Sequence, residues 1–205
     1  MSTTSWEARR AGASELPQVA TVLARAFEDD PLWRWVVGPR DDADRRARLD
    51  RFFAAVIGKL HARHELVFTT GDFAGAAVWD PPGQWQVRLG DEARVAPAAL
   101  GAFGLGVTRL LRLLLAVERA HLREPHYYLF SIGADPALQG RGVGAALLAP
   151  MLARCDAEGM PAYLESSNRR NVPFYRRHGF LETGELQIAD GVQLTLMRRP
   201  PPARQ

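Results

Sequence analysis

The chain has 205 residues, 47% of them hydrophobic and 24% charged, with a formal net charge of +3 at pH 7. These values are typical of one globular domain and exclude a disordered or fibrous chain. Most basic residues are arginines interspersed with acids, so no nucleic-acid-binding surface is expected. The single cysteine, Cys155, excludes a disulfide framework or a cysteine metal cluster within the chain, and a cytoplasmic setting is expected.

Helices are predicted for most of the first half of the chain. Apolar residues recur at helical spacing after Ser14, a good N-cap, and again over residues 42–64. Residues 97–122 are helical in outline, but three glycines lower the helix propensity and predict a broken helix pair. The apolar stretch 95–108 has about 14 residues, fewer than the roughly 20 of a membrane span, so no membrane is expected as a partner.

Strand-like runs at 66–70 and 73–79 flank Gly71-Asp72, which predicts a hairpin with a two-residue type I′ turn. The last third predicts, in order, the strand 126–134, the helix 139–158, the strand 161–166, the short helix 172–178 and the strands 180–188 and 192–198. This alternation predicts an α/β (α+β) fold with a central mixed sheet flanked by helices. We expect one domain over residues 1–199 and a disordered tail over residues 200–205.

A glycine-rich turn separates the strand 126–134 from its helix. It consists of Gln139, Gly140, Arg141, Gly142, Val143, Gly144 and Ala145. Glycines at alternate positions let the backbone come close to a bulky anion, and the following helix N-terminus presents unpaired N–H groups to it. The ligand that fits is a pyrophosphate.

The same turn matches the fingerprint of nicotinamide-binding folds through Gly140, Gly142 and Ala145, with Glu165 placed to hold a ribose hydroxyl. That fingerprint normally begins directly at a strand end near the start of the fold. Here five residues, 135–139, follow the strand before Gly140, and about 60 residues remain, too few for the doubly wound frame. A nicotinamide-dependent oxidoreductase is therefore the weaker alternative.

Two motifs at the right separation resemble the Gcn5-related N-acetyltransferase (GNAT) superfamily. The turn 139–144 matches its Gln/Arg-x-x-Gly-x-Gly/Ala signature after Asp135-Pro136, and 174–180 (Phe-Tyr-Arg-Arg-His-Gly-Phe) matches its second hallmark. Segments 161–165 and 172–175 are similar to the puromycin-acetyltransferase-like branch. The resemblance covers the element order of the whole chain. It implies a GNAT fold whose splayed strands hold acetyl-CoA as co-substrate.

The resemblance also implies where the co-substrate binds. The backbone of Ile132, Gly133 and Ala134 would pair with the pantetheine arm, and the amides of residues 139–145 would hold the pyrophosphate. Asn168 stands where the family often has an asparagine facing the cofactor. Because Val172 precedes a proline, we expect it outside helical geometry, with Asn171 as the N-cap, so either asparagine is a candidate contact.

The catalytic roles follow from the same resemblance. Tyr175 would be the general acid that protonates the departing CoA thiolate, which a phenol of pKa about 10 can do. Glu165 is the candidate base, because an amine must be neutral to attack. The plainer alternatives are that Tyr175 is a core aromatic and that Glu165 pairs with a surface cation such as Arg169 or Arg170.

The sequence predicts a primary amine acceptor, either a small molecule or a peptide. Asp29, Asp30 or Asp80 would attract a cationic amine, beside a pocket shaped by Trp33, Trp35, Trp79 and Trp85. The five histidines lack metal-ligand spacing, so no metal is expected. The apolar stretch 96–115 is a candidate homodimer contact. A CoA-binding module without catalysis is the second alternative.

Overall fold

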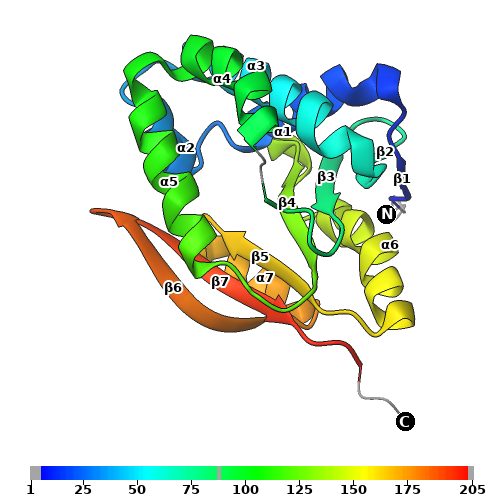
Figure 1. Ribbon diagram of the computed structural model, residues 1–205. Coiled ribbons are helices and arrows are strands. Elements are labelled where there is room, and N and C mark those ends of the chain that lie inside the picture. The colour runs from blue at the N-terminus through cyan, green and yellow to red at the C-terminus, as the bar shows by residue number, and fades with distance from the viewer. Residues whose placement is uncertain (1–5, 87–88, 203–205) are drawn as a thin grey trace.

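The computed structural model describes residues 6–86 and 89–202. Its centre is a seven-stranded mixed sheet in the order β1-β2-β3-β4-β5-β7-β6 (Figure 1). The strands are β1 (Ala8–Arg10), β2 (Val67–Thr70), β3 (Gly75–Asp80), β4 (Tyr127–Ala134), β5 (Ala162–Ser166), β6 (Leu181–Ala189) and β7 (Val192–Arg199). Every pair is antiparallel except β4 and β5. This confirms the predicted mixed sheet and differs from the all-parallel sheet of a doubly wound fold.

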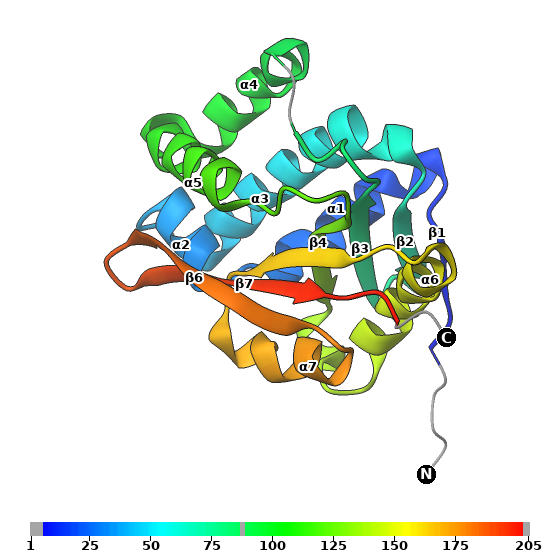
Figure 2. The same ribbon diagram turned by 60° about the horizontal axis from the view of Figure 1, so that its bottom comes forward.

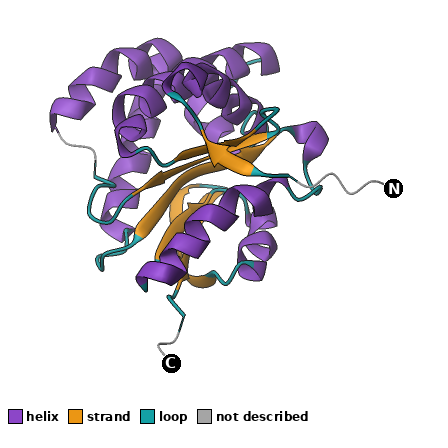
Figure 3. Cartoon of the chain, turned by 90° about the vertical axis from the view of Figure 1, so that its right-hand side faces the viewer, coloured by secondary structure: helices purple, strands orange, loops and turns teal. Residues whose placement is uncertain are grey.

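Helices cover both faces of the sheet (Figures 2 and 3). One face carries α1 (Leu16–Ala26), α2 (Pro31–Val37), α3 (Asp42–Val56), α4 (Leu89–Phe103) and α5 (Val107–Ala120), and the other carries α6 (Val143–Glu158) and α7 (Val172–Arg177). Alternate residues of β3 serve the two cores: Ala76 and Val78 face α1, whereas Ala77 and Trp79 face α6.

The parallel pair β4 and β5 separates soon after it forms. The two strands pair only at Tyr127 with Ala162 and at Tyr128 with Tyr163. Further along β4, Leu129 pairs with Trp79 of β3 and Ser131 pairs with Val78, so Phe130 between them has no partner in β3. Such a β-bulge bends the strand, here away from β5. Residues 132–134 therefore bond to β3 on one side and have no strand on the other. A gap in the sheet opens toward the carboxyl ends of both strands.

Two predictions about turns and caps are wrong. The β2–β3 loop spans residues 71–74 instead of a two-residue turn, because the Thr70 hydroxyl accepts from the Ala74 amide at 2.8 Å and Phe73 takes a φ of 55°. A 3₁₀ turn (Ala13–Glu15) precedes α1, and the N-cap of α1 is Glu15 instead of Ser14. The short strand β1 was not predicted either.

The start of α7, at Asn171 and Val172, also differs from expectation. Val172 is helical, with φ −54° and ψ −46°, although it precedes a proline. Its side chain is 5% exposed in the core under α7, so packing outweighs the local steric preference. Asn171 stands at the N-cap position as expected, but its side chain makes no capping bond.

The helix pair α4–α5 confirms the predicted break. Gly104, with φ +53°, lies in the 3₁₀ turn (Gly104–Gly106) that joins the two helices. By length and composition alone the run Gly90–Ala120 is sufficient to cross a membrane, yet the bend divides it into two shorter helices. Leu110 and Leu113 of α5 are buried in the core between the sheet and α1–α5, so α5 covers that face of the sheet.

Candidate functional site

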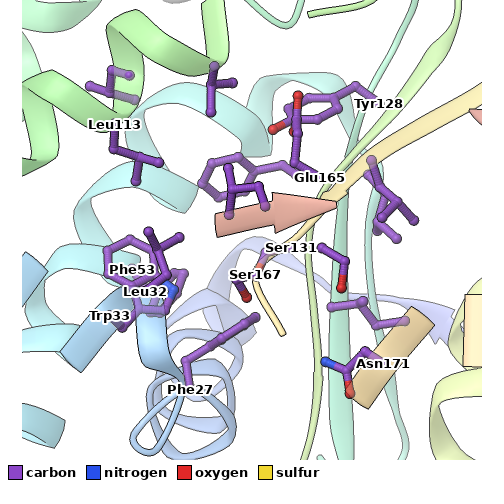
Figure 4. A pocket seen from close by; sticks show the side chains of 18 of the residues that line it. Phe27, Leu32, Trp33, Phe53, Leu113, Tyr128, Ser131, Glu165, Ser167 and Asn171 are labelled. Carbon is purple, nitrogen blue, oxygen red and sulfur yellow. The ribbon is translucent and has the colours of Figure 1, made fainter. Parts of the chain in front are cut away.

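A pocket of about 150 Å³ lies where β4 and β5 separate, and α1, α2, α3 and α5 enclose it (Figure 4). Its apolar side includes Phe27, Leu32, Trp33, Phe53, Leu113 and Val117. Its polar side includes Tyr128, Ser131, Glu165, Ser167, Asn171 and Tyr175. The pocket thus joins the gap in the sheet to an apolar chamber under α5.

Tyr175 reaches the pocket from α7, on the opposite side of the sheet from α1–α5. The residue is 7% exposed and packs edge-on against the Phe180 ring at 5.9 Å. Burial, with a smaller contribution from the Asp30 carboxylate, raises the pKa of Tyr175 above its usual value of 10. The phenol is therefore protonated throughout the neutral pH range and is available as a proton donor.

Asp30 fixes the relation between the helical layer and the end of β5. Its Oδ1 caps α2 by accepting from the amides of Leu32 (3.0 Å) and Trp33 (3.4 Å), and its Oδ2 accepts from the Ser167 hydroxyl at 2.7 Å. Burial raises the pKa of Asp30, and these hydrogen bonds oppose that rise. Asp30 thus has partners on both oxygens and is a structural group beside the pocket.

Glu165 takes part in a buried chain of hydrogen bonds. Its Oε1 lies 3.0 Å from His121 Nδ1, and His121 Nε2 lies 3.0 Å from His126 Nε2. His126 Nδ1 lies 2.7 Å from the main-chain carbonyl of Glu124. The side chains of His121 and Glu165 are 0% and 5% exposed. The expected alternative, a salt bridge from Glu165 to Arg169, is not formed, because Arg169 pairs with Glu185.

The chain of bonds determines how many protons these groups hold. A carbonyl only accepts, so His126 carries a proton on Nδ1. Burial lowers the pKa of His126 below 6.5, so its Nε2 is bare and accepts from His121. A further proton must then lie between His121 Nδ1 and Glu165. With that proton in place, every contact in the chain is a hydrogen bond.

Aromatic rings enclose this histidine–glutamate chain. Trp85 stacks on His121 with ring centroids 3.6 Å apart, and Tyr128 and Tyr163 approach the same ring edge-on. Burial first, and then the Glu165 carboxylate, raise the pKa of both tyrosines. No sequence pattern predicts the pairing of His121 with His126, because His121 follows α5, His126 precedes β4, and the two meet only in the fold.

The glycine-rich turn lies at the N-terminus of α6, as expected. Gly140 and Gly142 have φ values of +74° and +90°, and no side chain caps the helix. Helix geometry leaves the amides of Val143, Gly144 and Ala145 without intrahelical acceptors. Trp6 braces the turn by donating from Nε1 to the Arg141 carbonyl at 2.9 Å.

Two contacts place this turn relative to the pocket. A Cβ at Gly144 would meet the Phe174 ring at 3.0 Å, so the turn packs directly against the residue before Tyr175. Arg25 of α1 pairs with Asp135 at 2.6 Å, and Asp135 also accepts from the Ala137 amide. These contacts hold the turn and the end of β4 against α7 and α1, two helices that border the pocket.

The predicted asparagines occupy different places. Asn168 is engaged locally, since its Oδ1 accepts from the Arg170 amide at 3.0 Å and its carbonyl accepts from the Ser166 hydroxyl. Asn171 lines the pocket. Along β4, the Ser131 hydroxyl is buried without a hydrogen-bond partner and also lines the pocket. Asn171 and Ser131 are thus the free polar groups of this wall.

The acids expected to attract an amine lie elsewhere. Asp29 is exposed near Arg34, and Asp80 is 1% exposed and pairs with His61 at 2.7 Å. Of the predicted tryptophans, Trp33 lines the pocket, whereas Trp79 is buried on the opposite sheet face. Cys155 is 0% exposed, and burial raises the pKa of its thiol to about 12, so it is not an activated nucleophile.

The acetyltransferase (GNAT) family matches residues 27–180, more than half of the chain. The chain belongs to the GNAT family. An uncharacterized N-acetyltransferase of Schizosaccharomyces pombe is 28% identical over 95% of this chain and 83% of its own length. This membership and the sheet described above confirm the predicted GNAT fold and acetyltransferase class.

Two solved structures extend the comparison. A Corynebacterium glutamicum protein described as histone acetyltransferase HPA2 and related acetyltransferase superposes with a TM-score of 0.73 and 26% identity, over 98% of this chain and 99% of that one. The polyamine N-acetyltransferase of Drosophila melanogaster gives a TM-score of 0.58 at 19% identity, over 95% and 98% of the two chains. At 19% identity the second likeness concerns the fold alone.

The hydrogen bonds around His126 predict which of its ring nitrogens carries the proton. Neutral His126 should carry its proton on Nδ1, the less common form in water, because Nε2 must accept from His121. Nitrogen-15 NMR of the imidazoles at pH 7 should show this tautomer. His126 should become charged only well below pH 6.5, since burial lowers its pKa. A neutral His126 protonated on Nε2 would contradict the hydrogen-bond chain.

Proposed function

We propose that this GNAT protein transfers the acetyl group of acetyl-CoA to a primary amine by direct attack in a ternary complex. One observation carries the proposal. The pocket where β4 separates from β5 contains Glu165 and Tyr175 and reaches the free side of β4 at Ile132, and the uncapped N-terminus of α6 packs against α7, the helix that carries Tyr175. This arrangement suits a thioester with a long polar tail and an amine that arrives from the other side.

The free side of β4 and the uncapped N-terminus of α6 fit the cofactor that the family implies. The main chain of Ile132, Gly133 and Ala134 has room to add hydrogen bonds to the amides of a pantetheine arm. Residues 139–145, from Gln139 to Ala145, would surround the pyrophosphate, where the partial positive charge of α6 favours an anion. Asn171 would contact the arm near the thioester, and Asn168 would hold the local turn.

Bound acetyl-CoA supplies a thioester whose acyl carbon can accept a nucleophile. Glu165 accepts a proton from the incoming ammonium and leaves a neutral amine, whose nitrogen forms the new bond to the acyl carbon. Tyr175 donates its phenolic proton to the sulfur as the carbon–sulfur bond breaks. The tyrosinate then regains the proton that the nitrogen loses. The balance is one amide, one CoA thiol and one proton left on Glu165.

His121 and His126 hold the base in place. His121 bonds to Glu165 Oε1, and His126 bonds to His121 and is itself fixed by the Glu124 carbonyl. In this proposal His121 and His126 support Glu165, and Glu165 touches the substrate.

Tyr175→Phe should lower kcat by about 100-fold or more, because the leaving thiolate loses its proton donor. Affinity for acetyl-CoA, measured by calorimetry, should stay unchanged. Tyr127→Phe is the matched control: its hydroxyl donates to Glu158 at 2.7 Å, at the C-terminal end of α6 and outside the pocket. This control should cost about 1 kcal/mol of stability and keep its turnover. Acetyl-CoA binding without turnover of any amine by the wild type would favour the CoA-binding module instead.

Glu165→Gln should lower kcat/KM by about 100-fold at pH 7, because most of the amine is then protonated and lacks a base. The deficit should shrink toward pH 10, where a larger fraction of the amine is neutral without help. Glu185→Gln, on the exposed strand β6, serves as the control. An equal deficit at both pH values would contradict the base role.

Gly142→Ala should weaken CoA binding about 10-fold, because a methyl group would lie where the backbone must approach the pyrophosphate. Gly159→Ala is the control at the other end of α6: its φ is also positive, at +62°, and an added Cβ would meet no atom within 4 Å. Both variants should lose about 1–2 kcal/mol of stability in urea unfolding. Unchanged CoA binding by Gly142→Ala would remove the turn from the cofactor site.

A further inference from the structure

We propose that the acceptor is an amine with a single positive charge and an apolar body, such as an alkylamine or an arylalkylamine. This inference rests on the proposed function and names the substrate class of the same pocket. It follows from the shape of the chamber under α5, from the charges around it and from the state of Glu165.

The chamber beyond the reaction centre is apolar on facing sides. Leu113 of α5 lies on one side, and Trp33 and Phe53 lie on the other (Figure 4). Leu114 and Val117 of α5 also line the pocket. Trp33 and Phe53 pack against each other with ring centroids 5.3 Å apart, so this side is a solid aromatic surface. An apolar body placed here exchanges water for hydrocarbon on both sides, which favours binding.

Few charges face the chamber. Among the described residues that line the pocket, Glu165 is the only acid, and there is no lysine or arginine. The neighbouring acids are engaged elsewhere, since Asp30 caps α2 and binds Ser167, and Asp80 pairs with His61. A second ammonium or guanidinium on the acceptor would find no partner there, and neither would a substrate carboxylate.

The contact between His121 and Glu165 sharpens this selection. One oxygen of Glu165 is engaged with His121, so the other is left for the reacting ammonium, and no second acid in the described lining is available for a dication. Burying an unpartnered charged group is costly, so diamines, agmatine and free amino acids should be poor acceptors. This separates the chain from the Drosophila polyamine N-acetyltransferase, which forms N-acetylagmatine.

The test compares acceptors that differ by one charge. With acetyl-CoA in excess, CoA release should be measured for hexylamine, hexamethylenediamine, 2-phenylethylamine and agmatine. Hexylamine should exceed hexamethylenediamine by about 100-fold in kcat/KM, since the two differ only in the second ammonium. Equal or better use of the diamine or of agmatine would overturn the inference and leave the proposed function intact.

Introducing an acidic side chain at the chamber tests whether the apolar body of the acceptor binds there. Leu114 lines the pocket and is 47% exposed, so Leu114→Glu should be tolerated and offer the missing partner. The preference for hexylamine should fall about 10-fold or more. Leu111→Glu is the control, because Leu111 lies on the same helix outside the pocket at 52% exposure. Its preference should match the wild type.

Two outcomes separate the failure of this inference from that of the proposed function. No CoA release with any amine, from protein that binds acetyl-CoA, would count against the acetyltransferase reaction itself. A second outcome would overturn the inference alone, because it would assign the chamber to the acyl chain. In that outcome every amine supports CoA release, octanoyl-CoA is used better than acetyl-CoA, and Leu114→Glu changes nothing.

Discussion

The separation of β4 from β5 after two paired residues is the constraint on which the rest of the site depends. A sheet that continued to pair would leave no free main chain at residues 132–134 and no opening toward Tyr175. The bulge at Phe130 bends β4 while β3 keeps its bonds on the other side. Because the strand stays fixed on one edge only, it can offer the other edge to a ligand without loss of the sheet.

Keeping that opening requires contacts that span it. Asp30 joins the start of α2 to Ser167 just past β5, and Arg25 joins α1 to Asp135 just past β4. Both contacts run from the helical layer to the loops that follow the diverging strands. Gly144 of α6 packs against Phe174 of α7 and joins the helices that follow those loops on the opposite face. The gap is therefore braced from both sides of the sheet.

The sequence predicted those parts of the site that are local in the chain. The glycines at 140, 142 and 144 and the hallmark around Tyr175 are short patterns, and the structure packs Gly144 against Phe174, the residue before Tyr175. His121 and His126 were not predicted, because their role depends on the approach of α5 to β4 and on Glu165 from a third element. Asp30 was predicted as an amine-attracting acid, yet its bonds to α2 and Ser167 are visible only in three dimensions.

An apolar chamber and a catalytic carboxylate are compatible here because of the shared proton. An isolated carboxylate in such surroundings would be costly to bury and would draw water or cations into the pocket. His121 removes that cost by holding a proton against Glu165, and His126 holds His121 in place through a bond that ends on a main-chain carbonyl. The carboxylate thus keeps its position and one face for the substrate, while the chamber beside it stays suited to hydrocarbon. The position of the proposed base and the proposed acceptor preference thus both depend on one buried hydrogen-bond chain.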